Sequence, residues 1–557
     1  MDMGGASGRV DPEQIPSVPR ARDAAERYYR EHMYLTMEQH VPPPAAIPYV
    51  SFDQGNSSPR HARLTLNSIP SSSDALAQTA LPLGLVLQPF APQAEGEQPI
   101  PVLDFQEAGP PRCRRCRAYI NPFMQFKAGG NKFVCNMCTF PNDVQQDYFA
   151  PTDPSGIRVD RDDRPELRHG TVEFVVPKEY WVKEPVGIRW LFVIDVSMEA
   201  VHKGLLAAMC TGILESLYGE KEEIEGSEGE SKTKQVLPTG SKVGFVTFDR
   251  DVHFYNCHAS RQQPEMMIMP DVEDPFVPLG SDGLFSDPYE SRHVIEKLLA
   301  QLPEMFAQPK PQPILLPALN SALGALEKFG GKIICSISSL PTEGPGKLIH
   351  RDNGKLHGIE TEKKLFQTES VAWRKAASDM VKNGVGVDFF LSAPGGGYMD
   401  VATIGHVSAQ SGGEIFYFPN WHAPRDTAKI SQEIKHTLTR ETGYQALLKV
   451  RCSNGLQVSG YHGNFVQHTF GADLEFGTMD ADKAVGVMFS YDGKLDPKLD
   501  AHFQSALLYT TSSGERRVRC TNTVASVNEG GSESMRFIDQ DAVVSMIAKE
   551  GKSRAVG

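Results

Sequence analysis

Four cysteines have the spacing of a tetrahedral metal site. Cys113 and Cys116 form one Cys-x-x-Cys pair, Cys135 and Cys138 form a second, and 18 residues separate the two pairs. Each pair can form a tight turn that offers two thiolates to one side, and the run between them can return as a hairpin. Four sulfur ligands leave no open position, so we expect one structural Zn²⁺ without a catalytic role. The alternative is four unrelated cysteines that are buried or joined in disulfides.

Arginine is concentrated around the first cysteine pair, at Arg112, Arg114, Arg115 and Arg117. Such a cluster could grip phosphates, so a zinc-ribbon nucleic-acid-binding protein is one alternative function. The whole chain carries a net charge of −13, and no aromatic residues are interleaved with these arginines. Proteins that bind nucleic acid or anionic membranes generally need a cationic excess to release counterions. We therefore expect no nucleic-acid partner.

The remaining residues show no catalytic pattern. No serine or cysteine nucleophile stands with a base and an orienting group. The run Ala393-Pro394-Gly395-Gly396-Gly397 follows an apolar stretch but lacks the Lys and Ser/Thr of a phosphate-binding loop. We predict a protein that is not an enzyme.

The size and the cysteine usage indicate a large cytosolic protein. A length of 557 residues corresponds to roughly three or four domains. No apolar run is long enough to span a bilayer, and the N-terminus has neither a basic region nor an apolar segment for secretion. Five further cysteines are scattered through expected core elements, which suits reduced thiols in the cytoplasm.

The elements that must position the cysteines lie on both sides of them. Residues 1–60 are rich in Pro, Gly and Ser, and we expect a disordered lead-in with one short helix near 21–34. Residues 61–108 contain two strand-like runs bounded by turn residues. The zinc ribbon is expected at 109–148, followed by a linker and one strand at 149–186.

An α/β pattern then occupies residues 187–440. Continuous apolar runs predict strands buried on both faces of a parallel sheet, and helical periodicity lies between them. Alternating strands and helices predict a doubly wound sheet with right-handed crossovers. The strands are expected at 190–195, 242–248, 332–337 and 385–391, and the helices at 201–217, 290–302, 318–329, 370–381 and 401–410. From 441 to 530 the period changes to two, which predicts antiparallel strands, and one helix follows in 531–557.

Several ordered motifs resemble one known family. The zinc-ribbon run Arg-Cys-Arg-Arg-Cys-Arg-Ala-Tyr-Ile-Asn-Pro-Phe, at 112–123, is similar to that of the Sec24-type cargo adaptors of the inner COPII vesicle coat. Further matches in the same order are Leu81–Phe90, Leu191–Ser197, Gly244–Asp249, Gly330–Ile334, Leu340–Gly346, Gly514–Arg519 and Asp539–Ala542. The resemblance implies a zinc ribbon, a trunk similar to a von Willebrand A domain, and a β-sandwich built from strands before the ribbon and after the trunk. In such adaptors a helical and a gelsolin-like domain follow, so we expect a chain truncated just inside the helical domain.

The resemblance also implies a function and its residues. Such adaptors select membrane cargo by binding acidic sorting signals, for vesicle transport from the endoplasmic reticulum to the Golgi. By position, Arg112 and Arg117 match arginines of the cargo groove, and Arg517 and Arg519 are expected to supply its other wall. Guanidinium forks hold carboxylates bidentately, which suits this role. Solvated or structurally paired arginines are the alternative.

The implied partners are those of the coat. They are the GTPase-activating sister subunit, the small coat GTPase, the cytosolic tails of membrane cargo and, peripherally, the endoplasmic reticulum membrane. The sister subunit itself is a further alternative identity. Domains similar to von Willebrand A also carry a metal site in Asp-x-Ser-x-Ser, at Asp195, Ser197 and Glu199 here. The third position is altered to glutamate, so we expect the fold without that metal.

Overall fold

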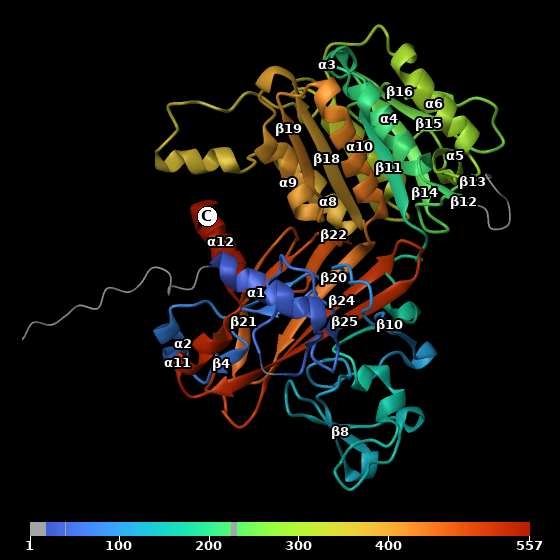
Figure 1. Ribbon diagram of the computed structural model, residues 1–557. Coiled ribbons are helices and arrows are strands. Elements are labelled where there is room, and N and C mark those ends of the chain that lie inside the picture. The colour runs from blue at the N-terminus through green and yellow to red at the C-terminus, as the bar shows by residue number, and fades with distance from the viewer. Residues whose placement is uncertain (1–17, 39, 224–230, 557) are drawn as a thin grey trace, which may run out of the picture.

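The computed structural model describes residues 18–38, 40–223 and 231–556. Figure 1 shows an α/β body at the top, two β-sheets in the middle and a small module around β8 at the bottom. These parts are called the trunk, the sandwich and the zinc module below. No helix in the described ranges is both long enough and apolar enough to cross a membrane.

The trunk is a seven-stranded sheet with helices on both faces. Its central strand, β11 (Arg189–Asp195), is buried at every residue, which explains why its sequence is a continuous apolar run. Four neighbours continue the sheet in parallel, but β15 (Val252–Asn256) pairs antiparallel with the strands on both of its sides, so the sheet is mixed. The strand order is β16 (Glu265–Met269), β15 (Val252–Asn256), β14 (Lys242–Phe248), β11, β17 (Gly331–Ile337), β18 (Val385–Ala393) and β19 (Ile415–Pro419).

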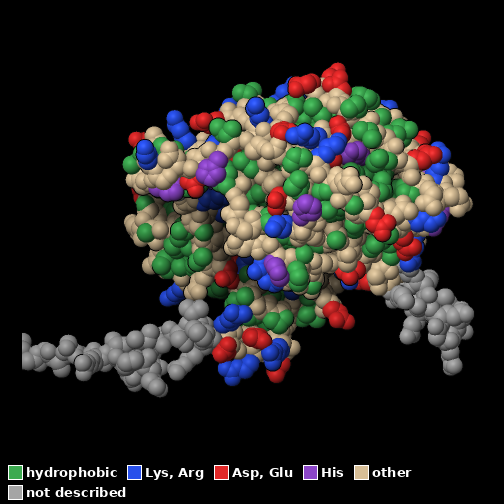
Figure 2. All heavy atoms as spheres, turned by 90° about the horizontal axis from the view of Figure 1, so that it is seen from above, with side chains coloured by type: hydrophobic (Ala, Val, Ile, Leu, Met, Phe, Trp, Pro, Cys, Tyr) green, Lys and Arg blue, Asp and Glu red, His purple; other side chains and the backbone are tan. Residues whose placement is uncertain are grey.

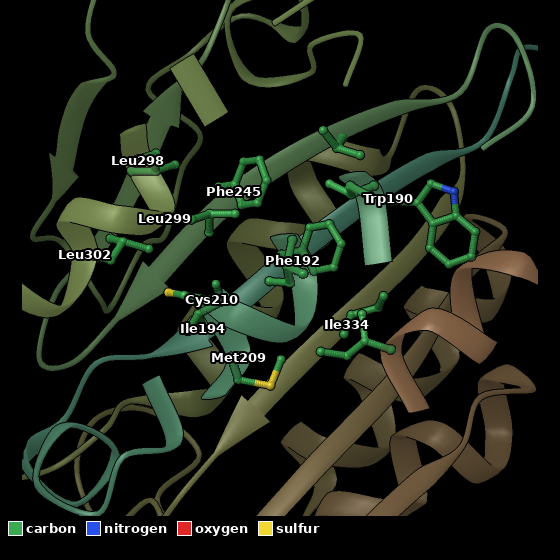
Figure 3. Packing of buried hydrophobic residues seen from close by; sticks show 14 of the residues in the cluster. Trp190, Phe192, Ile194, Met209, Cys210, Phe245, Leu298, Leu299, Leu302 and Ile334 are labelled. Carbon is green, nitrogen blue, oxygen red and sulfur yellow. The ribbon is translucent and has the colours of Figure 1, made fainter. Parts of the chain in front are cut away.

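Successive residues of β11 point into two different cores. Trp190, Phe192 and Ile194 pack among helices on one face, whereas Leu191 and Val193 face the helices on the other. Figure 3 shows the first of these cores, with Phe245 and Ile334 contributed by the neighbouring strands. The first face is covered by α3 (Met198–His202), α4 (Leu205–Tyr218), α6 (Arg292–Met305) and α10 (Ala423–Thr439), and the second by α7 (Leu315–Leu326), α8 (Val371–Lys382) and α9 (Val401–Ser411).

The sandwich is assembled from strands that flank the zinc module and the trunk in the sequence. Its larger sheet has the order β22 (Leu474–Asp480), β20 (Thr442–Cys452), β24 (Ala501–Thr511), β25 (Arg516–Asn528), β10 (Thr171–Val175) and β6 (Val102–Asp104), with β4 (Ser68–Pro70) also on β25. The smaller sheet has the order β21 (Leu456–His462), β23 (Val485–Tyr491), β5 (Gly84–Leu87) and β3 (Ala62–Leu64). One apolar core joins the two sheets.

A fully buried ion network joins the trunk to the sandwich. The ammonium group of Lys332, on β17, lies 2.8 Å from Asp388 of β18 and 3.2 Å from Asp480 of β22. Arg440 completes the network at 2.9 Å from Asp480 and 3.4 Å from Asp388. The strands approach closely here, because a Cβ on Gly477 would lie 2.0 Å from the carbonyl oxygen of Val385.

The lead-in differs from the expectation, and the C-terminal helix forms where it is expected. Within the expected disordered lead-in, residues 1–17 lie outside the described residues, but α1 (Val18–Glu31) is followed by the buried side chains of Tyr34, Ile47 and Tyr49. The pairing of β1 (Tyr34–Leu35) with β2 (Ser51–Phe52) orders this segment, and such a short register leaves little periodicity in the sequence. At the other end, α12 (Gln540–Val556) packs on the sandwich through the fully buried Met546.

The face of the trunk seen from above has interspersed charges. Lys and Arg side chains alternate there with Asp and Glu side chains (Figure 2). The zinc module lies at the opposite end of the molecule (Figure 1). The arginines of the first cysteine pair are therefore remote from this mixed surface.

Candidate metal centre and arginine pocket

Two turns of the same form present the four cysteines. In the first, the Arg117 amide donates to the Cys113 carbonyl at 3.0 Å, and in the second the Thr139 amide donates to the Cys135 carbonyl at 2.9 Å. Arg117 and Thr139 both have left-handed backbone angles, with φ of 61° and 57°. The strands β7 (Gln125–Lys127), β8 (Lys132–Val134) and β9 (Pro141–Asp143) connect and support the two turns. The turns therefore form as the Cys-x-x-Cys spacing predicts.

The four sulfurs form a compact cluster that fits a zinc ion. The Sγ atoms of Cys113 and Cys138 lie 3.6 Å apart, and those of Cys116 and Cys135 lie 3.5 Å apart. All four lie within 4.8 Å of one another. A tetrahedral ion with Zn–S bonds of about 2.3 Å requires sulfur separations of about 3.8 Å. The hydrogen bond between Cys116 and Cys135 lowers the pKa of the Cys116 thiol to about 5 and raises the pKa of the Cys135 thiol, so without an ion the pair favours a single thiolate.

The zinc module is fixed to the larger sheet of the sandwich. Its core is continuous with Phe174 of β10 and with Val518 of β25. The side-chain amide of Gln504 both accepts from the Tyr119 amide at 2.8 Å and donates to the Tyr119 carbonyl at 3.0 Å. Arg451 donates to the Cys116 carbonyl at 2.9 Å. The module therefore has a fixed orientation on the sheet.

Arg112 is held beside the first turn by three contacts. Its Nε donates to the Arg117 carbonyl at 3.0 Å, and its Nη1 donates to the Tyr180 hydroxyl at 3.4 Å. Its guanidinium carbon lies 4.2 Å from the centroid of the Tyr119 ring, a cation–π arrangement. Arg117 is exposed, and no ion pair joins its side chain to another described residue. One arginine is thus pre-oriented, and the other presents an unpaired charge.

A pocket of about 270 Å³ opens between this turn and the segment before the trunk. Its lining includes Arg112, Arg114 and Arg117 of the zinc module and Pro177, Glu179 and Tyr180 of the segment before the trunk. Arg114 lies 3.7 Å from Asp143, which also lines the pocket. Three arginines against the carboxylates of Asp143 and Glu179 leave a net positive lining. We call this the arginine pocket.

The structure does not place Arg517 and Arg519 in the arginine pocket. Both lie on one face of β25, as their spacing predicts, but the alternate residues Val518 and Cys520 face the zinc module. Arg517 and Arg519 therefore point to the opposite side of the sheet. They do not line the arginine pocket, whose lining includes Glu179 and Tyr180 instead, and their expected role in cargo binding stays a prediction. Nothing in the linker sequence marked Glu179 and Tyr180.

A shared carboxylate holds Arg517 and Arg519. Glu173, which is 2% exposed, accepts from Arg517 at 2.8 Å and from Arg519 at 2.7 Å. Arg519 also donates to the Pro89 carbonyl and to Glu441, each at 2.8 Å. These donors of Arg519 are engaged within the protein.

Three parts of the chain match domain families. Residues 110–148 match the Sec23/Sec24 zinc finger, residues 185–438 the Sec23/Sec24 trunk domain, and residues 443–528 the Sec23/Sec24 beta-sandwich domain. The crystal structure of the human COPII-coat protein Sec24c is similar with a TM-score of 0.87 and 35% identity. That similarity covers 96% of this chain and 71% of the Sec24c chain. The chain belongs to the Sec24 family.

Curated Sec24 proteins are similar over nearly all of this chain. Protein transport protein SEC24 B of Arabidopsis thaliana is 38% identical over 91% of this chain, which corresponds to 45% of that protein. Protein transport protein Sec24C of Homo sapiens is 36% identical over 97% of this chain and 49% of that protein. This Sec24-family chain therefore spans about half the length of these relatives. The predicted fold class is confirmed, and so is one structural Zn²⁺ at the four cysteines.

In this Sec24-family chain, other protein groups donate hydrogen bonds to the carboxylate of Asp195. Asp195 is the first residue of the altered metal motif that also contains Ser197 and Glu199. Asp195 is fully buried and accepts from the Ser197 amide at 2.8 Å, and from the amide and hydroxyl of Ser338 at 2.8 and 2.6 Å. Burial raises the pKa of the Asp195 carboxyl. Glu199 is half-buried on α3, and no hydrogen bond joins it to Asp195. Asp195 thus ties β11 to the residue that follows β17.

Proposed function

We propose that this Sec24-family chain is a COPII coat component that selects membrane cargo by binding acidic sorting signals. It would act in vesicle transport from the endoplasmic reticulum to the Golgi. The observation that carries the proposal is the arginine pocket, where Arg112, Arg114 and Arg117 line a cavity beside the zinc turn. The names of the relatives, protein transport protein Sec24 and COPII-coat protein Sec24c, support the same role.

Binding in the arginine pocket would rest on fixed positive charge. Arg112 is held by Tyr119 and Tyr180, so little side-chain entropy is lost when it meets a carboxylate. Arg117 is exposed and offers a guanidinium fork for two parallel hydrogen bonds. The bound zinc supplies no chemistry beyond holding the turn. The proposed mechanism is therefore recognition without bond-making, and the protein is not proposed to be an enzyme.

The same proposal includes partners and a location. The chain would pair with the GTPase-activating sister subunit of the inner coat and, with the small coat GTPase, act peripherally on the cytosolic face of the endoplasmic reticulum membrane. The trunk-domain match supports this placement, because that family includes both Sec23 and Sec24. Each carboxylate contact would be weak, and many copies in a lattice would supply avidity.

A peptide-binding measurement tests the proposal. The probe is a cytosolic-tail peptide with one glutamate beside aliphatic residues, and the matched probe carries glutamine instead. We expect the double variant Arg112→Ala, Arg117→Ala to bind the glutamate peptide about tenfold or more weakly, because charge-assisted hydrogen bonds are lost. Arg115→Ala is the control, since Arg115 is exposed in the same turn but does not line the pocket. Equal affinity of the wild type for the two peptides would reject the proposed site.

A further inference from the structure

A second pocket lies where the trunk meets the sandwich. It has a volume of about 220 Å³ and lies between α8 and the strands β20 and β22, which adjoin in Figure 1. Its apolar lining includes Val182, Leu447 and Phe476. Arg516, Lys183 and Lys382 also line it, against one carboxylate, that of Glu475. It shares no lining residue with the arginine pocket.

Arg516 is the unusual member of this lining. It is only 3% exposed, and its Nη1 donates to the Gln445 carbonyl at 2.7 Å and to the Thr510 hydroxyl at 3.1 Å. Its Nε is buried without a partner, and no bond joins its Nη2 to any described residue. No carboxylate among the described residues pairs with it, and burial lowers its pKa to about 10. A buried guanidinium without a counter-charge is costly.

Other arginines of this chain show what the free edge of Arg516 can hold. Arg158 places Nε and Nη2 on Asp160 at 2.8 and 2.7 Å. Arg351 uses the same two nitrogens for Asp400, at 3.0 and 2.6 Å. Nε and Nη2 form one edge of the planar guanidinium, and this edge matches the two oxygens of a carboxylate. On Arg516 this edge is the part without a partner.

We propose that this pocket binds a short peptide segment in which a carboxylate lies beside an aliphatic side chain. The carboxylate would pair with Nε and Nη2 of Arg516, and the aliphatic group would contact Val182 and Leu447. Lys183 and Lys382 would add positive charge at the rim. Lys183 already donates to the Asn383 carbonyl at 2.9 Å, which fixes its position. The proposal does not depend on cargo binding in the arginine pocket.

A singly charged carboxylate fits this lining better than a phosphate does. Only one guanidinium edge is free, and it satisfies two oxygens rather than three. The apolar walls offer nothing to further phosphate oxygens.

Side-chain NMR of arginine tests the proposal on the whole chain. The probes are acetyl-Val-Glu-amide, the matched acetyl-Val-Gln-amide and inorganic phosphate. The Nε–H signal of Arg516 is identified as the one missing from the Arg516→Lys spectrum. We expect the glutamate peptide to shift this signal saturably. The glutamine peptide should bind about tenfold more weakly, because it lacks the charge. Equal shifts by both peptides, no shift by either, or a shift by phosphate alone would overturn the proposal.

Two variants separate binding from folding. Arg516→Lys keeps the charge but loses the bidentate edge, so we expect glutamate-peptide affinity to fall about tenfold. Glu475→Gln leaves Arg516 intact and removes the nearby negative charge, so we expect affinity to rise about twofold to fivefold. Urea unfolding midpoints report whether each variant folds. Unchanged or lower affinity in a folded Glu475→Gln variant would contradict the assignment even if Arg516→Lys does not fold.

Discussion

Asn142 links the metal cluster to the arginine turn. Its Nδ2 lies 3.5 Å from the Sγ of Cys113, and its Oδ1 accepts from the Arg114 amide at 2.8 Å. The side chain is 2% exposed and comes from β9, on the far side of the hairpin. A hydrogen bond to a ligating sulfur orients the ligand and stabilises its negative charge. One asparagine thus supports both the zinc ligand and the backbone that carries the arginines.

Replacing Asn142 should weaken zinc binding. We expect Asn142→Ala to lower zinc affinity by about tenfold to a hundredfold, because a partner of a metal ligand is lost. Competition with a chelator of known affinity measures this change. Asn131→Ala is the control, since Asn131 is exposed in the same hairpin and its side chain bonds only to the local Ala128 carbonyl. Equal zinc affinity in the two variants would show that Asn142 does not support zinc binding.

The ion cluster at Glu173 should make stability depend on acid pH. Burial alone would raise the pKa of Glu173, but Arg519, Tyr509 and Arg517 outweigh it and hold the pKa below its usual value. A lowered folded-state pKa contributes stability that is complete above the unfolded value of about 4.3 and is lost as pH falls through the folded value. We therefore expect the free energy of unfolding to fall between pH 5 and pH 3.

Glu173→Gln separates this contribution from those of other carboxylates. We expect the variant to lose about 3–5 kcal/mol near neutral pH, because two buried or half-buried guanidinium groups lose their shared partner. Its stability should then fall less steeply in acid than that of the wild type, as urea unfolding at several pH values would show. Glu107→Gln, at an exposed glutamate, should keep the wild-type slope. A wild-type slope in Glu173→Gln would contradict the cluster's titration.

The buried network at Lys332 should stabilise the junction of trunk and sandwich. Lys332→Met leaves Asp388 with Arg440 at 3.4 Å, and Asp480 with Arg440 at 2.9 Å and Lys483 at 4.0 Å. We expect a loss of about 3–5 kcal/mol in the free energy of unfolding, because an uncompensated buried charge remains. Chemical denaturation followed by tryptophan fluorescence measures it.

The exposed Lys328 provides the control for this prediction. Lys328→Met should change stability by no more than about 0.5 kcal/mol. Adding Asp388→Asn to Lys332→Met should cost less than the sum of the single changes, since the two groups interact directly. Additive losses would show that the pair is not coupled.

Patterns with a strict local period could be predicted from the sequence. The strand expected at 242–248 is observed as β14 with the same bounds, because a strand buried on both faces leaves a continuous apolar run. The cysteine turns were also predictable, because metal ligation fixes the spacing within each pair. The strands β15 and β16 were not predicted at all, and an apolar run would not have specified the antiparallel direction of β15 beside β14.

Contacts between distant segments could not be predicted. Arg517 and Arg519 share a face, as their spacing requires, but the sequence does not tell which side of the sheet holds the zinc module. Tyr180 reaches Arg112 from a segment without any motif. Arg516 precedes two paired arginines in the same run, and only the structure shows that it lacks a carboxylate.

A charge-exchange measurement tests most directly the claim that the zinc-held turn grips carboxylates. The Arg117→Glu variant is titrated with two tail peptides that differ only in glutamate or lysine at the acidic position, and zinc content is measured alongside. We predict that the variant keeps its zinc. Its affinity for the glutamate peptide should fall by about tenfold or more and its affinity for the lysine peptide should rise, because the charge at position 117 is reversed. Undiminished binding of the glutamate peptide by zinc-loaded Arg117→Glu would contradict the account.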